Sequence, residues 1–202
     1  MRDITFGLVT EGPTDFELIT QLIQKIVPGE HRFLPLQPDL SATEGFGVHG
    51  GGWKGVFSWC EKFGADPGIF FYMNNMTPAI DVLIIHIDAD ISRDQEINCA
   101  RPCPEAEATV IELENKLNLA LNVQDLMGRI IFCIPSDNTE GWILAVFDSS
   151  HHNPPSQYIE CIQQPEYIIS SPQYKLIKRK EGKPKKNQST YREKLIPEVL
   201  QK

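Results

Sequence analysis

The amino-acid sequence predicts an α/β protein with a central, mostly parallel β-sheet of about four strands. Residues 82–87, VLIIHI, form a near-continuous apolar run, which is typical of a strand buried on both faces of a parallel sheet. Strand-like segments also alternate along the chain with segments whose apolar residues recur at helical spacing. This alternation is expected where helices connect parallel strands.

The order of the elements follows from these periodicities. The expected strands are 4–10, 32–37, 82–87 and 129–135, and the expected helices are 15–27, 54–64, 104–121, a short helix after 136 and a final helix at 189–200. Pro35 restricts the second strand to an edge of the sheet, because proline cannot donate a ladder hydrogen bond. The run 129–135 is apolar enough to predict another buried strand.

Composition and length limit the organisation. The chain has 202 residues, and after residue 150 prolines and lysines become frequent. We therefore expect an α/β domain over 1–150 and a C-terminal extension over 151–202, with a basic segment at 178–188. The net charge of −8 argues against broad electrostatic binding of nucleic acid, so any such contact is expected to be local or helped by bound cations.

The sequence favours a cytoplasmic protein. It has no apolar run of the roughly 20 residues that a membrane span needs, and the N-terminus lacks the pattern of a signal peptide. Five scattered cysteines are an odd number, which predicts reduced thiols rather than a disulfide framework. Cys99 and Cys103 form a lone CxxxC pair without the second pair that a zinc site usually shows.

Acidic residues follow three of the predicted strands. They are Glu11 and Asp15 after the first, Asp88 and Asp90 after the central one, and Asp137 and Glu140 after the last. In a parallel sheet these strand ends share one edge, where ligands bind. Asp88 and Asp90 are two residues apart and would point the same way along a strand.

Such a group of carboxylates, with few obvious basic partners in the sequence, would repel itself unless a cation neutralised it. Oxygen ligands suit Mg²⁺ or Mn²⁺, and these ions serve phosphate chemistry. The sequence therefore predicts a metal site formed by Glu11, Asp15, Asp88 and Asp90. For each acid alone, a role as a helix cap or turn residue is an equally good interpretation.

Four further residues are candidates for substrate binding. Lys183, Lys185 and Lys186 lie in the basic segment and would contact phosphates, although a solvated tail explains the same charge run. His49 lies in the glycine-rich stretch 41–55, which would let a backbone approach phosphate or simply form a surface loop.

Several of these motifs together resemble a known family. A strand followed by EGPTD and a helix, and a later strand that ends in DAD, is similar to the TOPRIM domain of topoisomerases, primases and OLD-family nucleases. Glu11-Gly12 and Asp88-Ala89-Asp90 match its EG turn and its DxD motif. Glu140 in SDNTEGWILAVFD and the stretch GKPKKNQSTYREKL resemble a bacterial TOPRIM-like family with members linked to phage defence. The resemblance covers roughly residues 4 to 195.

The resemblance implies a three-layer, Rossmann-like fold and a nuclease that depends on Mg²⁺ or Mn²⁺ and cleaves DNA or RNA, as an effector in anti-phage defence. Glu11 would be a metal ligand or general acid/base, and Asp88 and Asp90 would bind metal. Glu140 would complete the catalytic site. Asp15 lies where many nuclease-type members carry another acid.

Other modules of that family are missing from the sequence. It contains neither a topoisomerase tyrosine module nor a primase zinc module, so strand passage and priming are not expected. GGGWKG is no Walker loop, because its glycine-to-lysine spacing is wrong and Gly55 replaces the Ser or Thr. A separately encoded ATPase partner would fit this pattern, and the sequence leaves the oligomeric state open.

Two other functions stay open. DADIS fits the D-x-D-x-[ST] loop of haloacid-dehalogenase-like phosphatases, in which the first aspartate, here Asp88, is the nucleophile. That loop usually follows the first strand, whereas here it follows a late one, and EGPTD is then unexplained. The second open interpretation is a catalytically silent, TOPRIM-like regulatory subunit that binds metal or nucleotide and a partner protein.

Overall fold

The computed structural model describes residues 3–39, 47–103, 106–123, 125–147 and 158–201. The chain forms two compact units. The sheet unit comprises Met1–Ile87 and Leu113–Cys133, and the second unit comprises Asp88–Glu112 and Ile134–Lys202. The domain boundary predicted at residue 150 lies outside the described residues and stays a prediction.

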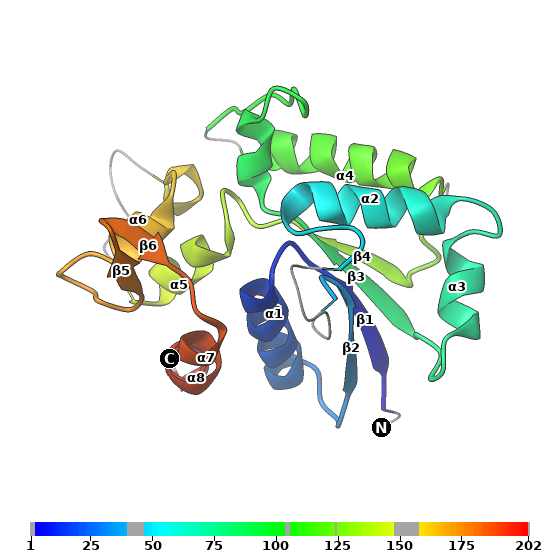
Figure 1. The fold of residues 1–202 in the computed structure, drawn as a ribbon, viewed down its shortest axis with the longest axis horizontal. Helices are drawn as coiled ribbons and strands as arrows, with labels where there is room; N and C mark the ends of the chain where they lie inside the picture. The colour runs from blue at the N-terminus through cyan, green and yellow to red at the C-terminus, as the bar shows by residue number, and fades with distance from the viewer. Residues whose placement is uncertain (1–2, 40–46, 104–105, 124, 148–157, 202) are drawn as a thin grey trace. The chain divides into compact units, whose positions relative to one another are not determined.

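The sheet unit contains four parallel strands, which confirms the predicted α/β class. The strands are β1 (Thr5–Val9), β2 (Arg32–Gln37), β3 (Val82–His86) and β4 (Ile130–Cys133), in the order β2-β1-β3-β4. All three neighbouring pairs are parallel, and the register of the central pair aligns Val9 with Ile85. The carboxyl ends of β1 and β3 therefore lie side by side at one edge of the sheet (Figure 1).

Helices cover both faces of this sheet. They are α1 (Pro13–Ile26), α2 (Gly52–Gly64), α3 (Ile69–Asn75) and α4 (Glu107–Leu121), of which the last crosses from one unit into the other. The chain moves from β1 to β2 in one direction and from β2 past β1 to β3 in the other. Because parallel crossovers are right-handed, α1 lies on one face and α2 on the opposite face, as Figure 1 shows.

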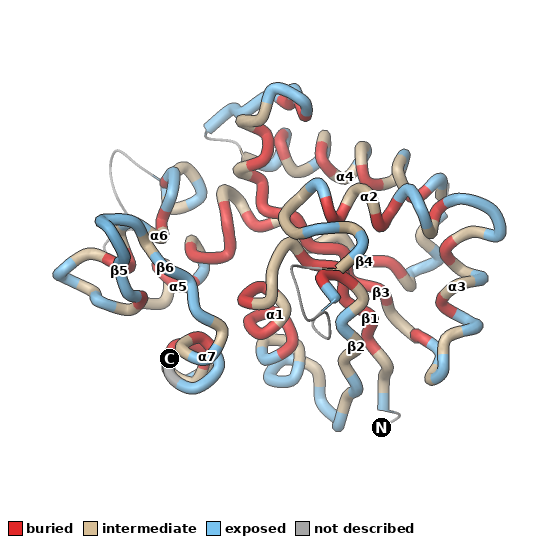
Figure 2. Tube along the Cα trace, in the orientation of Figure 1, coloured by how far each residue is buried: buried red, intermediate tan, exposed pale blue. Residues whose placement is uncertain are grey.

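The core of the sheet unit lies along the two central strands (Figure 2). Phe6, Leu8 and Ile84 pack with Ile19 of α1. β3 is buried as predicted, since it lies between β1 and β4 and helices cover both faces of the sheet (Figure 1). β4 differs from the expected buried strand: it is an edge strand, and Ile131 is 49% exposed.

The second unit consists of short elements joined by loops. They are η1 (Ala89–Arg93), α5 (Thr139–Phe147), η3 (Ile159–Cys161), α6 (Pro165–Ile169), β5 (Lys178–Lys180), β6 (Lys183–Lys185), α7 (Gln188–Thr190), η4 (Tyr191–Leu195) and α8 (Ile196–Gln201). The basic segment is no simple tail, because β5 and β6 pair antiparallel. Their turn has positive φ at both Glu181 and Gly182, as in a two-residue hairpin turn.

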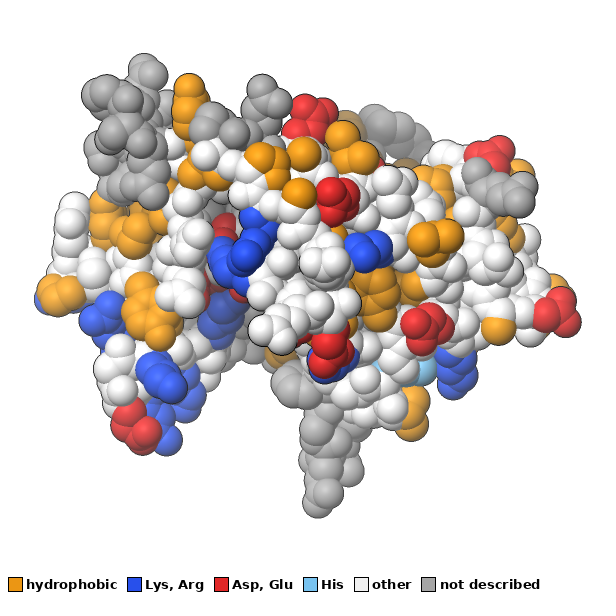
Figure 3. All heavy atoms as spheres, turned by 90° about the horizontal axis from the view of Figure 1, so that it is seen from above, with side chains coloured by type: hydrophobic (Ala, Val, Ile, Leu, Met, Phe, Trp, Pro, Cys, Tyr) orange, Lys and Arg blue, Asp and Glu red, His pale blue; other side chains and the backbone are white. Residues whose placement is uncertain are grey.

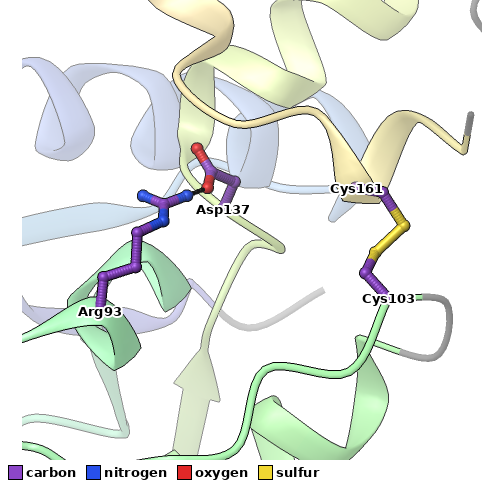
Figure 4. The surroundings of a disulfide bond; sticks show 4 residues. All are labelled: Arg93, Cys103, Asp137 and Cys161. Carbon is purple, nitrogen blue, oxygen red and sulfur yellow. Dashed lines mark ion pairs between the residues drawn. A yellow bond between two sulfur atoms is a disulfide. The ribbon is translucent and has the colours of Figure 1, made fainter.

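A disulfide joins Cys103 to Cys161 within the second unit (Figure 4). The prediction that all cysteines are reduced is therefore wrong for this pair, while Cys60, Cys99 and Cys133 carry free thiols. Sequence spacing gave no sign of the pair, because the two cysteines are 58 residues apart. Among the described residues, no helix has the length and apolar character to cross a membrane.

Gly64 allows a close approach of α2 to the end of α4. A Cβ atom at this position would lie 2.5 Å from the carbonyl oxygen of Leu121. We predict that Gly64→Ala lowers the free energy of unfolding by about 1–3 kcal/mol, because the backbone of α4 must move. Denaturant titration would measure this.

Gly141 provides the matched control. It lies inside α5, and a Cβ there would meet its nearest atom at an ordinary 3.7 Å. Gly141→Ala should raise the free energy of unfolding by up to about 1 kcal/mol through helix propensity. Equal effects of the two substitutions would contradict the packing argument.

Candidate functional site

Asp88 and Asp90 begin the second unit, directly after the central strand β3. Asp88 is buried, and Asp90 lies in the first turn of η1 with a side chain that is 39% exposed. Backbone hydrogen bonds hold this segment: the N–H of Ala89 donates to the carbonyl of Pro135 at 3.1 Å, and that of Asp90 donates to the carbonyl of Asp137 at 2.8 Å. The loop after β4 thereby fixes the DxD motif.

The carboxylate of Asp88 lies at the N-terminus of α5. Its Oδ1 accepts a hydrogen bond from the backbone N–H of Thr139 at 3.2 Å. Asn138 completes the helix start, since its Oδ1 accepts the N–H of Glu140 at 3.1 Å. Asp88 therefore takes part in helix capping, as the structural interpretation of this acid expected, and the hydrogen bond orients its carboxylate.

Asp137 is paired with a cation. Figure 4 shows the guanidinium group of Arg93 directed at the Asp137 carboxylate, with which it forms an ion pair. The other carboxylate oxygen of Asp137 accepts the backbone N–H of Gln164 at 2.9 Å. Arg93 approaches Asp90 more loosely, at 3.9 Å. Arg93 therefore pairs closely with Asp137 and more distantly with Asp90.

Glu140 is also paired. It is completely buried, its Oε1 accepts the hydroxyl proton of Tyr191 at 2.5 Å, and its Oε2 lies 2.6 Å from the Nζ of Lys186. A buried carboxylate needs such partners, because an unpaired charge away from water is costly. The structure thereby brings together two predicted site residues, Glu140 and Lys186, as an ion pair.

The pKa of Asp90 is shifted by its surroundings. Burial, and then the negative charge of Asp88, raise the pKa of Asp90 to about 6, although Arg93 and Lys186 act in the opposite direction. A carboxylate with a raised pKa beside a second carboxylate favours binding of a cation. The effect of Lys186 on this pKa also shows that its ammonium group lies within electrostatic range of Asp90.

These contacts revise one expectation from the sequence. The acids do have basic partners, namely Arg93 for Asp137 and Lys186 for Glu140. The like charges of Asp88 and Asp90 act on each other, and Asp88 helps to raise the pKa of Asp90. Within the described part of the chain, no group of three or more His, Cys, Asp or Glu side chains is arranged to hold a metal ion. The pair still suits Mg²⁺, which proteins often hold through one or two carboxylates, waters and substrate phosphates.

Three predicted site residues belong to the sheet unit. Glu11 follows β1, its carbonyl accepts the N–H of Gly52 at 2.9 Å, and its Oε2 lies near the start of α2. Asp15 is buried in the first turn of α1, beside Gly12. His49 lies within hydrogen-bond distance of Ser58 Oγ at 3.0 Å, and burial, then Lys62, lower its pKa. Their meeting with Asp88 and Asp90 stays a prediction.

Lys183 and Lys185 are exposed on β6, while Lys186 reaches Glu140. Sequence reasoning missed Arg93, Asn138 and Tyr191 as residues that support the site. Arg93 carried a weak signal, since it lies three residues after Asp90 and a helical turn brings such residues together. Tyr191 carried none, because it is 51 residues away from its partner Glu140.

Comparisons with known proteins found no matching protein-family model, no matching curated protein and no matching solved structure. The α/β class rests on the parallel sheet itself.

Because the pKa of Asp90 is raised in the folded protein, we predict that this residue makes the free energy of unfolding depend on pH. Its carboxyl titrates near 3.8 when unfolded and about 6 when folded, so its contribution to stability is present below about pH 4 and lost as pH rises through about 6. In EDTA, Asp90→Asn should therefore be more stable relative to wild type at pH 7.5 than at pH 4.

The measurement is the melting temperature of both proteins at the two pH values, with and without Mg²⁺. Mg²⁺ should stabilise wild type at pH 7.5 but stabilise Asp90→Asn much less, because the variant lacks one of the two charges that attract the ion. The same Mg²⁺ response in both proteins would contradict the assignment of Asp90 as a ligand.

Proposed function

We propose that this protein is a divalent-metal-dependent phosphodiester hydrolase that cleaves nucleic acid. The observation that carries the proposal is the DxD pair: the Thr139 N–H orients Asp88, and burial together with the charge of Asp88 raises the pKa of Asp90. A divalent ion would remove the repulsion between these carboxylates. Bound there, Mg²⁺ or Mn²⁺ would supply Lewis-acid activation of a phosphate or of water.

The side chains of the second unit support this chemistry. Asp88 is oriented by the Thr139 N–H, and Asp90 by the backbone hydrogen bond to Asp137. Lys186 lies within electrostatic range of Asp90 and would offer an ammonium group to a non-bridging phosphate oxygen. Glu140 and Tyr191 position Lys186 from the buried side and do not need to touch substrate.

In the sheet unit, the strand order reverses between β1 and β3, and in open α/β sheets ligands bind beyond the carboxyl ends of the strands at such a switch point. Glu11 follows β1 and the DxD motif follows β3. We include Glu11 as a further ligand or general acid/base, and Asp15 as an additional ligand, on the resemblance to TOPRIM nucleases. That resemblance also supports a role in phage defence with a separate ATPase partner.

The first test is cleavage of nucleic acid. Purified wild type should cut plasmid DNA, single-stranded DNA or RNA with Mg²⁺ or Mn²⁺ and not with EDTA. Asp88→Asn and Glu11→Gln should each reduce the rate at least about 100-fold, because each removes a proposed metal ligand. Gel assays with the three substrates would measure this.

Asp3→Asn is the control, because it removes an exposed carboxylate that lies outside the site. It should leave the rate unchanged. Full activity in both Asp88→Asn and Glu11→Gln would refute the site. No cleavage by folded wild type with any substrate would favour the regulatory-subunit alternative.

Lys186 allows catalysis and stability to be separated. Lys186→Met should lower the rate and also lower the melting temperature, because it leaves Glu140 buried without its cation. Adding Glu140→Gln should restore much of the melting temperature but not the rate. Recovery of the rate in the double variant would show that Lys186 serves the fold and not the substrate.

A further inference from the structure

The β5–β6 hairpin presents four lysines on one face. Its register places Lys178 opposite Lys185 and Lys180 opposite Lys183. Residues directly opposite each other in a sheet point to the same side, and so do residues two apart along a strand. All four ammonium groups therefore extend from the same face of the ribbon, which we call the lysine face, and all four residues are exposed.

The other face of the hairpin is attached to α6. Arg179, which alternates with the lysines, donates from Nε to Ser170 Oγ and from Nη2 to the carbonyl of Tyr167, both at 3.1 Å. Pro184 lies opposite Arg179. The hairpin is thus anchored by the face without lysines. In Figure 3, Lys and Arg side chains gather at the left, where Figure 1 has β5 and β6.

This arrangement is unfavourable for the hairpin alone. Like charges directly opposite each other destabilise a strand pair, and here both lysine pairs are of this kind. Glu181 reduces the repulsion between these lysines only slightly, because it lies 4.0 Å from Lys180 and both side chains are largely exposed. The chain as a whole carries a charge of −8, so the four lysines form a local positive surface on an acidic protein. Such a surface favours binding of a polyanionic partner.

We propose that the lysine face binds the phosphate backbone of a nucleic-acid duplex. A two-stranded ribbon fits the major groove of DNA. Residues 178–185 contain no aromatic side chain on which the bases of a single strand would stack. The inference names a duplex as the substrate of the proposed nuclease. The role of the lysine face in cleavage therefore rests on the proposed function.

The test is binding of the full-length protein to a labelled duplex in EDTA, measured by fluorescence anisotropy from about 50 to 200 mM salt. Lys178→Gln/Lys185→Gln should weaken binding at least about tenfold and reduce the slope of log affinity against log salt by about two. The charge-matched control Lys25→Gln/Lys116→Gln, in the sheet unit, should change neither. Equal weakening in the two double variants would overturn the proposal.

Lys180→Glu separates binding from folding. It places a carboxylate opposite Lys183, so the melting temperature should stay the same or rise while duplex binding weakens. Tighter binding of the matching single strand, or lysine-dependent binding of phosphatidylserine vesicles in place of the duplex, would also overturn the proposal.

Binding in EDTA is independent of catalysis, so the two proposals can fail separately. Lysine-dependent duplex binding without cleavage would refute the proposed nuclease activity and support duplex binding by the lysine face. Cleavage with the same KM in wild type and in the hairpin variants would support the nuclease and refute a role of the lysine face in substrate binding.

Discussion

The reversal of crossover direction between β1 and β3 is the constraint on which the candidate site depends. Because the chain leaves β1 toward one edge of the sheet and later passes it toward the other, α1 and α2 lie on opposite faces. The carboxyl ends of the two central strands are then not covered by a crossover between them. Glu11 follows β1 and Asp88 follows β3 along the chain, so neither carboxylate interrupts the buried apolar runs of these strands.

Within the second unit, close ion pairs give Asp137 and Glu140 a structural role. Asp137 and Glu140 follow β4 closely, as Asp88 and Asp90 follow β3, and by sequence all four look alike. The structure gives Asp137 an arginine and Glu140 a lysine together with a tyrosine hydroxyl. Both pairs also connect distant segments, so these acids stabilise the surroundings of the DxD motif.

The sequence predicted the elements whose patterns depend on neighbouring residues, and it missed contacts between residues far apart in the chain. The apolar run of β3 and the helical spacing of α1 each depend on a few adjacent residues, and both elements were predicted within two residues of their observed ends. The β5–β6 hairpin was missed because lysines replace the alternating apolar residues that usually mark strands. Tyr191 and the Cys103–Cys161 pair depend on contacts between residues more than 50 positions apart, which no local pattern reports.

The hairpin and the DxD motif are connected through one short stretch of chain. Lys183 and Lys185 belong to the lysine face, and the next residue, Lys186, reaches the buried Glu140 and lies within electrostatic range of Asp90. A backbone that docks on β6 would therefore be held by residues adjacent in sequence to the cation beside the carboxylates. Glu140 and Tyr191 would hold Lys186 in place, and Arg179 would hold the hairpin. The residues that bind the backbone and the lysine near the carboxylates would then keep a fixed geometry. This continuity explains how a strongly acidic chain can present a local positive surface close to its negatively charged site.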